Sequence, residues 1–177
     1  MSKNRYGTLW ICFCAVMAAL VFALDLLAIR VGNSYKITIS ALPIILTAVH
    51  YGPLSASLVG LTGAFLGQLL SYGIGATTLL WILPAGVRGI VVGLLFIAFG
   101  RKLKPLCLIP AVVISSIIVT VLNVVVGYID AYIYQYPFAV ASVDIFIKLL
   151  LGITTAVILS LVTIPVIKPV SKFLNSK

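Results

Sequence analysis

Two long apolar stretches, each with one cation near its middle, constrain the fold of this chain more than any other feature. The stretches are Thr77–Phe99 and Phe138–Ile164, with Arg88 eleven residues into the first and Lys148 ten residues into the second. About 20 apolar residues suffice for an α-helix to cross the roughly 30 Å hydrocarbon core of a bilayer. Both cations would then lie near the midplane, where a charge is costly unless it faces a partner or a polar cavity. We therefore expect Arg88 and Lys148 to mark a ligand site.

The composition agrees with a membrane protein and excludes a soluble domain. Of the 177 residues, 63% are hydrophobic and 8% are charged, and the mean hydropathy is +1.28, whereas soluble domains carry about 25% charged residues. The net charge of +9 comes from loop residues and not from a basic face with interleaved aromatic side chains, so no nucleic-acid partner is predicted. We predict an all-α protein that forms one integral domain over residues 1–177 in the lipid bilayer.

Hydropathy and turn signals predict six transmembrane helices. Their expected bounds are Leu9–Ile29, Ile37–Val49, Leu54–Leu70, Thr77–Phe99, Leu106–Ile133 and Phe138–Ile167. The first stretch follows Lys3 and Arg5, as a signal peptide would. It is long, however, and lacks a small-residue cleavage pattern, so we interpret it as a retained helix.

The positive charges predict the orientation of these helices. An even number of crossings puts both termini on one side, and that side collects eight lysines and arginines, whereas the opposite loops hold only Arg30 and Lys36. Because positively charged loops stay in the cytoplasm, both termini are predicted to be cytoplasmic. The fourth and sixth helices then both enter from outside, which puts Arg88 and Lys148 at matching depth.

The two cations have different neighbours. Asp144 precedes Lys148 by four residues, the favourable order for an ion pair on one helix face, so Lys148 could pair with Asp144 instead of a ligand. No acid stands within one turn of Arg88, whose alternatives are backbone carbonyls or Asp144 across the bundle. If both cations and Asp144 face one site, the two positive charges and one negative charge leave a net charge of +1 for an anionic ligand. The Arg88 guanidinium would then hold a carboxylate through two hydrogen bonds.

Other side chains could complete a polar site near the outer face. Asn123 and Gln68 offer hydrogen bonds, although both could instead join helices to each other. Aromatic side chains there could stack on a planar ligand or form an interfacial belt. They are Trp81, Tyr72, Tyr128 and Tyr132.

Several chemistries are not supported by the sequence. Three cysteines and one histidine are too few for a typical zinc site, so no metal is predicted. The chain has no P-loop, GxSxG or HExxH motif and only three acidic residues, which argues against an enzyme and against a bound cofactor. ATP hydrolysis, if the function needs it, would come from partner proteins.

Ala15, Ala19 and Ala23 repeat at four-residue spacing in the first predicted helix. We call these three residues the alanine ladder. Small residues at this spacing let another helix approach closely. The alanine ladder therefore predicts either contact with a partner helix or packing inside this bundle.

The segment Lys36–Gly67 carries a series of short motifs. A Lys-Ile start is followed by a Leu-Pro pair, a Gly-Pro turn and a glycine-rich helix: Lys36-Ile37, Leu42-Pro43, Gly52-Pro53, Gly60, Gly63 and Gly67. With six predicted helices, cytoplasmic termini and the alanine ladder, this pattern resembles the S components of energy-coupling factor (ECF) vitamin importers, and most of all their folate-type branch.

The resemblance implies a division of labour. An S component binds a vitamin from outside, mainly through the outer halves of its last three helices and the outer loops. It contacts a transmembrane coupling protein through the alanine ladder, and two ATPase subunits power transport. On this basis we expect a multi-pass protein of the bacterial cytoplasmic membrane that captures a small vitamin, with folate as the first candidate because its carboxylates suit a cationic pair.

Other functions stay open at this point. The vitamin or precursor could be pantothenate, pyridoxine, hydroxymethylpyrimidine or a deazapurine. The chain could also be a membrane assembly protein without a ligand, or a stand-alone channel or carrier that works without ATP or a partner.

Overall fold

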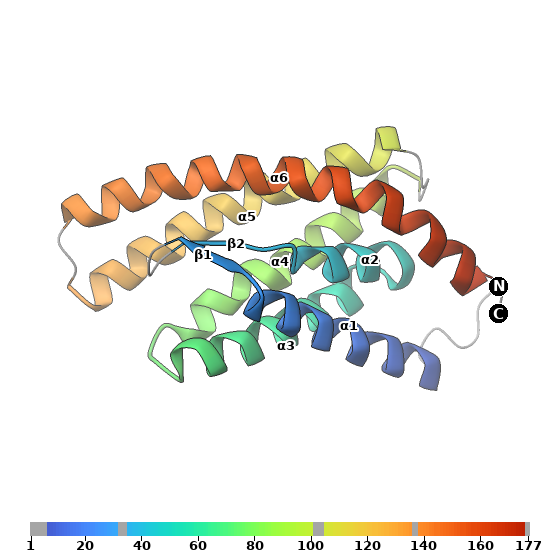
Figure 1. The fold of residues 1–177 in the computed structure, drawn as a ribbon, viewed down its shortest axis with the longest axis horizontal. Helices are drawn as coiled ribbons and strands as arrows, with labels where there is room; N and C mark the ends of the chain where they lie inside the picture. Colours follow the sequence, from blue (N-terminus) through green and yellow to red (C-terminus); the bar gives the residue numbers. More distant parts are fainter. Residues whose placement is uncertain (1–6, 32–34, 101–104, 136–137, 176–177) are drawn as a thin grey trace.

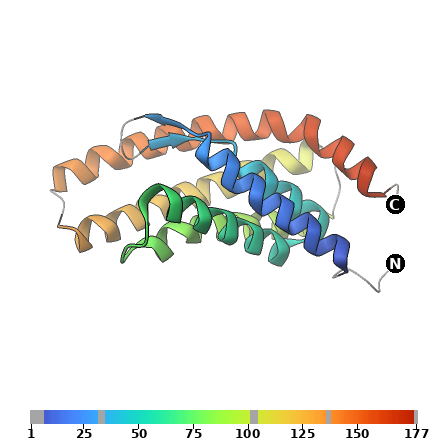
Figure 2. The same ribbon diagram turned by 60° about the horizontal axis from the view of Figure 1, so that its bottom comes forward.

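Six helices and one short β-hairpin make up the described part of the chain (Figure 1). The computed structural model describes residues 7–31, 35–100, 105–135 and 138–175. The elements are α1 Thr8–Leu26, β1 Ile29–Val31, β2 Tyr35–Ile37, α2 Ala41–Tyr51, α3 Pro53–Tyr72, α4 Thr78–Ala98, α5 Pro105–Ile133 and α6 Phe138–Asn175. The start of α1 and the end of α6 lie at the same end of the bundle (Figures 1 and 2).

Five of these helices, α1, α3, α4, α5 and α6, contain stretches long and apolar enough to cross a membrane. The predicted helical membrane architecture is thereby confirmed. The exception is α2, whose 11 residues span only about 16 Å, roughly half the hydrocarbon thickness. Six crossings and the cytoplasmic location of the termini stay predictions.

The segment between α1 and α2 differs from the prediction. The second helix begins at Ala41 and not at Ile37, because Tyr35–Ile37 pairs antiparallel with Ile29–Val31 in a hairpin. Thr38 ends this hairpin: its hydroxyl donates to the Leu24 carbonyl and accepts the Ser40 N–H, both at 3.0 Å. This hydroxyl ties the start of α2 to the last turn of α1.

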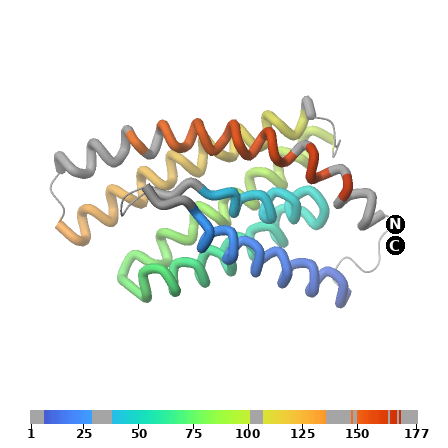
Figure 3. The backbone as a smooth tube through the Cα atoms, viewed as in Figure 1, coloured from blue at the N-terminus to red at the C-terminus, as the bar shows by residue number. Residues whose placement is uncertain are grey.

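The last helix is longer than predicted. It runs on from Ile167 to Asn175 and contains Pro165 and Pro169. Prolines are tolerated in membrane helices where neighbouring groups satisfy the freed carbonyls. Figure 3 traces the backbone as a tube that is coloured along the sequence.

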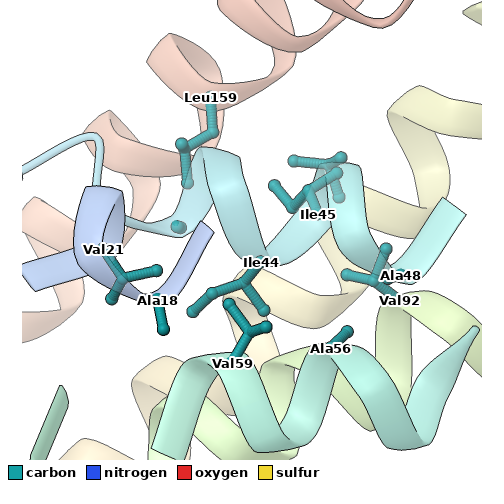
Figure 4. Close-up of a cluster of buried hydrophobic side chains, with 11 residues drawn as sticks. Ala18, Val21, Ile44, Ile45, Ala48, Ala56, Val59, Val92 and Leu159 are labelled. Carbon is teal, nitrogen blue, oxygen red and sulfur yellow. The ribbon is translucent and has the colours of Figure 1, made fainter. Parts of the chain in front are cut away.

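The core of the bundle surrounds α2. Six of its eight residues from Ala41 to Ala48 are buried hydrophobic or proline side chains, and Thr47 is buried as well. Figure 4 shows Ile44, Ile45 and Ala48 meeting side chains from α1, α3, α4 and α6. A helix buried on all sides reads as uniformly apolar, which explains why this short segment looked like a membrane span.

Glycines set the close contact between α3 and α4. A Cβ atom at Gly60 would lie 2.5 Å from the Ala85 carbonyl oxygen, and one at Gly89 would lie 2.5 Å from backbone atoms of Ala56 and Ser57. At Gly93 the nearest atom, Pro53 Cα, would be 2.6 Å away. The two helices therefore pack backbone to backbone and hold α4 rigidly against α3.

Candidate ligand site

Arg88 lies on the inner side of α4. It stands one turn from both Ala85 and Val92, which belong to or pack against the central core. The exposed side chains of this helix lie on its other side: Leu79, Leu83, Ile90, Leu94 and Ile97. Arg88 is itself partly buried, and no side chain in the described part of the chain pairs with its guanidinium. The cation therefore faces the bundle interior and not lipid, as predicted for a functional charge.

A hydrogen bond joins α4 to α5 near the ends of both helices that face away from the termini. The indole N–H of Trp81 donates to Asp130 Oδ1 at 3.3 Å. Trp81 is in the first turn of α4 and Asp130 is in the last turn of α5. The two helices run antiparallel (Figure 1), so this bond shows which residues of α4 and α5 lie at the same level along the bundle.

This alignment brings Arg88 and Asn123 to one level. Arg88 follows Trp81 by seven residues and Asn123 precedes Asp130 by seven, which is two helical turns, or about 10 Å, along each helix. Asn123 also shares the inner side of α5, since it lies one turn from the buried residues Val119 and Val126. A cation and an amide from neighbouring helices thus face the interior at the same depth.

The backbone of α6 reaches this level at Lys148. Gly152 of α6 packs directly against the Thr120 side chain of α5. Lys148 precedes Gly152 by one helical turn, so its backbone lies level with the α5 backbone near Asn123. The side chains of Asp144 and Lys148 lie outside the described ones, so their roles stay predictions.

The predicted tyrosines lie apart from this group. Tyr128 and Tyr132 are exposed, Tyr132 by 79% of its surface, and they project from the side of α5 opposite to Asn123 and Asp130. Tyr72, at the end of α3, is 57% exposed.

Gln68 is partly buried on the side of α3 that carries Leu61, a contact of Gly86 in α4. The antiparallel alignment of α3 with α4 puts it near Thr78, about three turns from Arg88. The structure therefore puts Arg88 and Asn123 at one level, with Trp81 two turns away on the same side of α4, and it does not bring the tyrosines or Gln68 to the level of Arg88.

Asp130 was not among the residues predicted for the site. Its seven-residue distance from Asn123, on one side of a helix, was a usable signal. A Cβ atom on Gly75 in the α3–α4 loop would lie 3.2 Å from the hydroxyl of Tyr134, which follows α5. These contacts lie where α4 begins and α5 ends, at the end of the bundle away from the chain termini.

The alanine ladder faces outward. Ala15, Ala19 and Ala23 are exposed, whereas Ala18 and Val21 on the other side of α1 are buried against α3. The alternative that the ladder packs inside this bundle is therefore wrong. Contact with a partner helix stays the prediction.

These features define a class of protein: a multi-pass helical membrane protein with a polar group of side chains between its later helices and a small-residue stripe on its first helix. The family model described as the S component of ECF-type riboflavin transporters matches residues 7–172. The chain belongs to this family.

A solved structure supports the fold. A chain described in a study of the structure and mechanism of the S component of a bacterial ECF transporter superposes with a TM-score of 0.68 and 19% sequence identity, covering 93% of this chain and 96% of that one. At this identity the likeness concerns the fold alone. No curated protein sequence matches the chain.

Family membership confirms the coarser predictions made from sequence. The chain is an S component, the substrate-binding subunit of an ECF importer, and such subunits pair with an energising module of a transmembrane coupling protein and ATPases. S components bind a small vitamin and are not enzymes, in agreement with the predicted lack of catalysis. The folate-type branch is not confirmed, because the matching family is named for riboflavin.

Proposed function

We propose that this chain captures riboflavin outside the bacterial cytoplasmic membrane and delivers it to an ATP-driven importer. The observation that carries this proposal is the riboflavin-type family match, which extends over residues 7–172. In the proposed topology α2 shares the bundle interior as a sixth, incomplete crossing, both termini are cytoplasmic, and the Trp81–Asp130 bond lies near the outer face.

The chemistry of riboflavin suits the described side chains. Riboflavin is uncharged near neutral pH and combines a flat ring, whose edge carries carbonyl oxygens and nitrogens, with a hydroxylated tail. The Arg88 guanidinium donates hydrogen bonds, and the Asn123 amide both donates and accepts them. An apolar wall with a few converging polar groups is the usual form of a small-molecule site.

A neutral ligand also suggests a role for the charges on α6. If Asp144 and Lys148 pair with each other, Arg88 is the one uncompensated cation at this depth, and a carbonyl oxygen can accept from it. A ligand with two carboxylates, such as folate, would need both cations free. If this pair forms, riboflavin suits the single remaining cation better than folate does.

The direct test is binding by the purified protein in detergent. We expect riboflavin to bind with a stoichiometry of one per chain, seen as quenching of flavin fluorescence and by calorimetry, and we expect folate and pantothenate not to compete. Binding of folate without riboflavin would replace the proposed ligand. Binding of neither vitamin would favour an assembly protein.

Ala19→Leu is expected to weaken association with the coupling protein by about tenfold or more, because the added branches hold the partner helix away from α1. Riboflavin binding should not change, since Ala19 lies on the exposed side. Pull-down of the coupling protein and calorimetry with riboflavin measure the two effects. Val121→Leu, which adds bulk to the exposed side of α5, is the control, and equal losses in both variants would exclude a specific role of the ladder.

Lys148→Met is expected to lower stability by about 1 kcal/mol, the usual size of a polar contact inside a membrane protein, by leaving Asp144 unpaired. Adding Asp144→Asn should restore most of this loss, because the pair is then removed as a unit. Thermal unfolding in detergent without ligand measures both variants. A double variant that is no more stable than Lys148→Met would argue against the pair and favour direct contact of Lys148 with the ligand.

A further inference from the structure

We propose that Asp130 is a positioning residue for the ligand site: by accepting the Trp81 indole N–H, it sets the alignment of α4 and α5 that brings Arg88 and Asn123 to one level. The ligand part of this proposal rests on the proposed function. The alignment part does not.

Asp130 joins α4 to α5 by a hydrogen bond at the end away from the termini, whereas Val92 and Val112 pack these helices together nearer the middle of the bundle. The glycines described in α4, namely Gly86, Gly89 and Gly93, pack against α3 and not against α5. The bond between Trp81 and Asp130 spans 49 positions in sequence and is partly buried. A shift of one helix by a single residue along the other would move Arg88 by about 1.5 Å relative to Asn123, enough to weaken a shared set of hydrogen bonds.

The chemistry of the pair explains why an acid stands there. A carboxylate accepts a hydrogen bond more strongly than a neutral group, and more so in surroundings of low dielectric. Indole has one N–H and no acceptor, so its orientation is set by where its acceptor lies. Trp81 lies on the same inner side of α4 as Arg88. Asp130 lies on the same inner side of α5 as Asn123. The bond between Trp81 and Asp130 therefore joins the two helix sides that carry Arg88 and Asn123.

The test compares two replacements of Asp130. Asp130→Asn keeps an acceptor oxygen, whereas Asp130→Leu has a similar size and none. Trp10→Phe serves as background, because Trp81 is then the single remaining tryptophan of the two in the chain. Ile129→Leu, on the neighbouring exposed position, is the matched control.

The first measurement needs no ligand. We expect Asp130→Leu to shift the Trp81 emission maximum to shorter wavelength, as an indole that has lost its polar partner does, and Asp130→Asn to shift it less. Unchanged emission in Asp130→Leu would overturn the proposal, whatever the protein binds.

The second measurement is riboflavin affinity. Asp130→Leu is expected to weaken binding by about tenfold and Asp130→Asn by less than about threefold, with Ile129→Leu unchanged. Replacing Arg88 by Met should cost less affinity in the Asp130→Leu protein than in wild type, because Arg88 is then already out of place.

The outcomes separate the two proposals. If wild type binds no riboflavin but Asp130→Leu shifts the emission, the proposed function fails and the alignment role stands. If Asp130→Leu lowers only the melting temperature and leaves both the affinity and the effect of Arg88→Met intact, Asp130 is a structural residue and the positioning role is refuted.

Discussion

Replacing Gly89 by leucine is expected to destabilise the bundle by about 3 kcal/mol, the upper part of the range for overpacking. A Cβ atom at this position would lie 2.5 Å from the Ala56 carbonyl carbon and the Ser57 nitrogen. These are backbone atoms of α3, so they cannot rotate aside as a side chain would. The melting temperature and the monodispersity of the protein in detergent measure the effect.

Gly89→Ala is a stricter test, because helix propensity and packing predict changes in stability of opposite sign. Intrinsic helix propensity alone favours alanine over glycine by about 1 kcal/mol, whereas the packing predicts a net loss because even one carbon collides with α3. Ile90→Leu, at the next and exposed position of α4, is the control and should be neutral. A Gly89→Ala protein as stable as wild type would mean that α3 and α4 are further apart than the structure has them.

Replacing Arg88 by methionine is expected to have opposite effects on binding and stability. Loss of a charged donor to the ligand should weaken riboflavin binding by about 30-fold, or roughly 2 kcal/mol. Stability without ligand should stay the same or rise, because methionine fills similar space and removes a cation from the bundle interior. Calorimetry and thermal unfolding of the same preparations measure the two effects.

A purely structural Arg88 would reverse this pattern. The variant would then melt at a lower temperature and bind riboflavin as tightly as wild type. Asn123→Leu, on the opposing helix, should resemble Arg88→Met in affinity if both residues contact the ligand.

The sequence predicted most of the helices because long apolar runs and the Gly-Pro turn are local signals. It also predicted an inward-facing Arg88, since the cost of a cation in hydrocarbon leaves few alternatives. The hairpin at Ile29–Ile37 could not be predicted in this way, because three-residue strands are too short for a period to show. The bounds of α2 were missed for a related reason: a fully buried short helix and the end of a membrane span have the same composition.

Which residues form the site depends on contacts between helices, and the sequence of a single helix does not show these contacts. Trp81 was predicted from its chemistry, but its partner Asp130 lies on another helix. The tyrosines were grouped with the site by their nearness in sequence to the outer face, yet Tyr128 and Tyr132 point away from Asn123. Val119, Asn123 and Val126 share the inner side of α5, but Val121 and Val125 are exposed, so the spacing of valines alone does not show which side faces inward.

The central core has a consequence for the cell that carries this protein. One turn beyond Arg88, Val92 joins Ile45, Val112 and Leu159, which come from four different helices and are each at most 1% exposed. Within the part of the chain that the structure describes, side chains packed this tightly leave no room for a file of water at this level of the bundle. We therefore expect that this subunit on its own lets neither protons nor sodium ions cross a lipid bilayer.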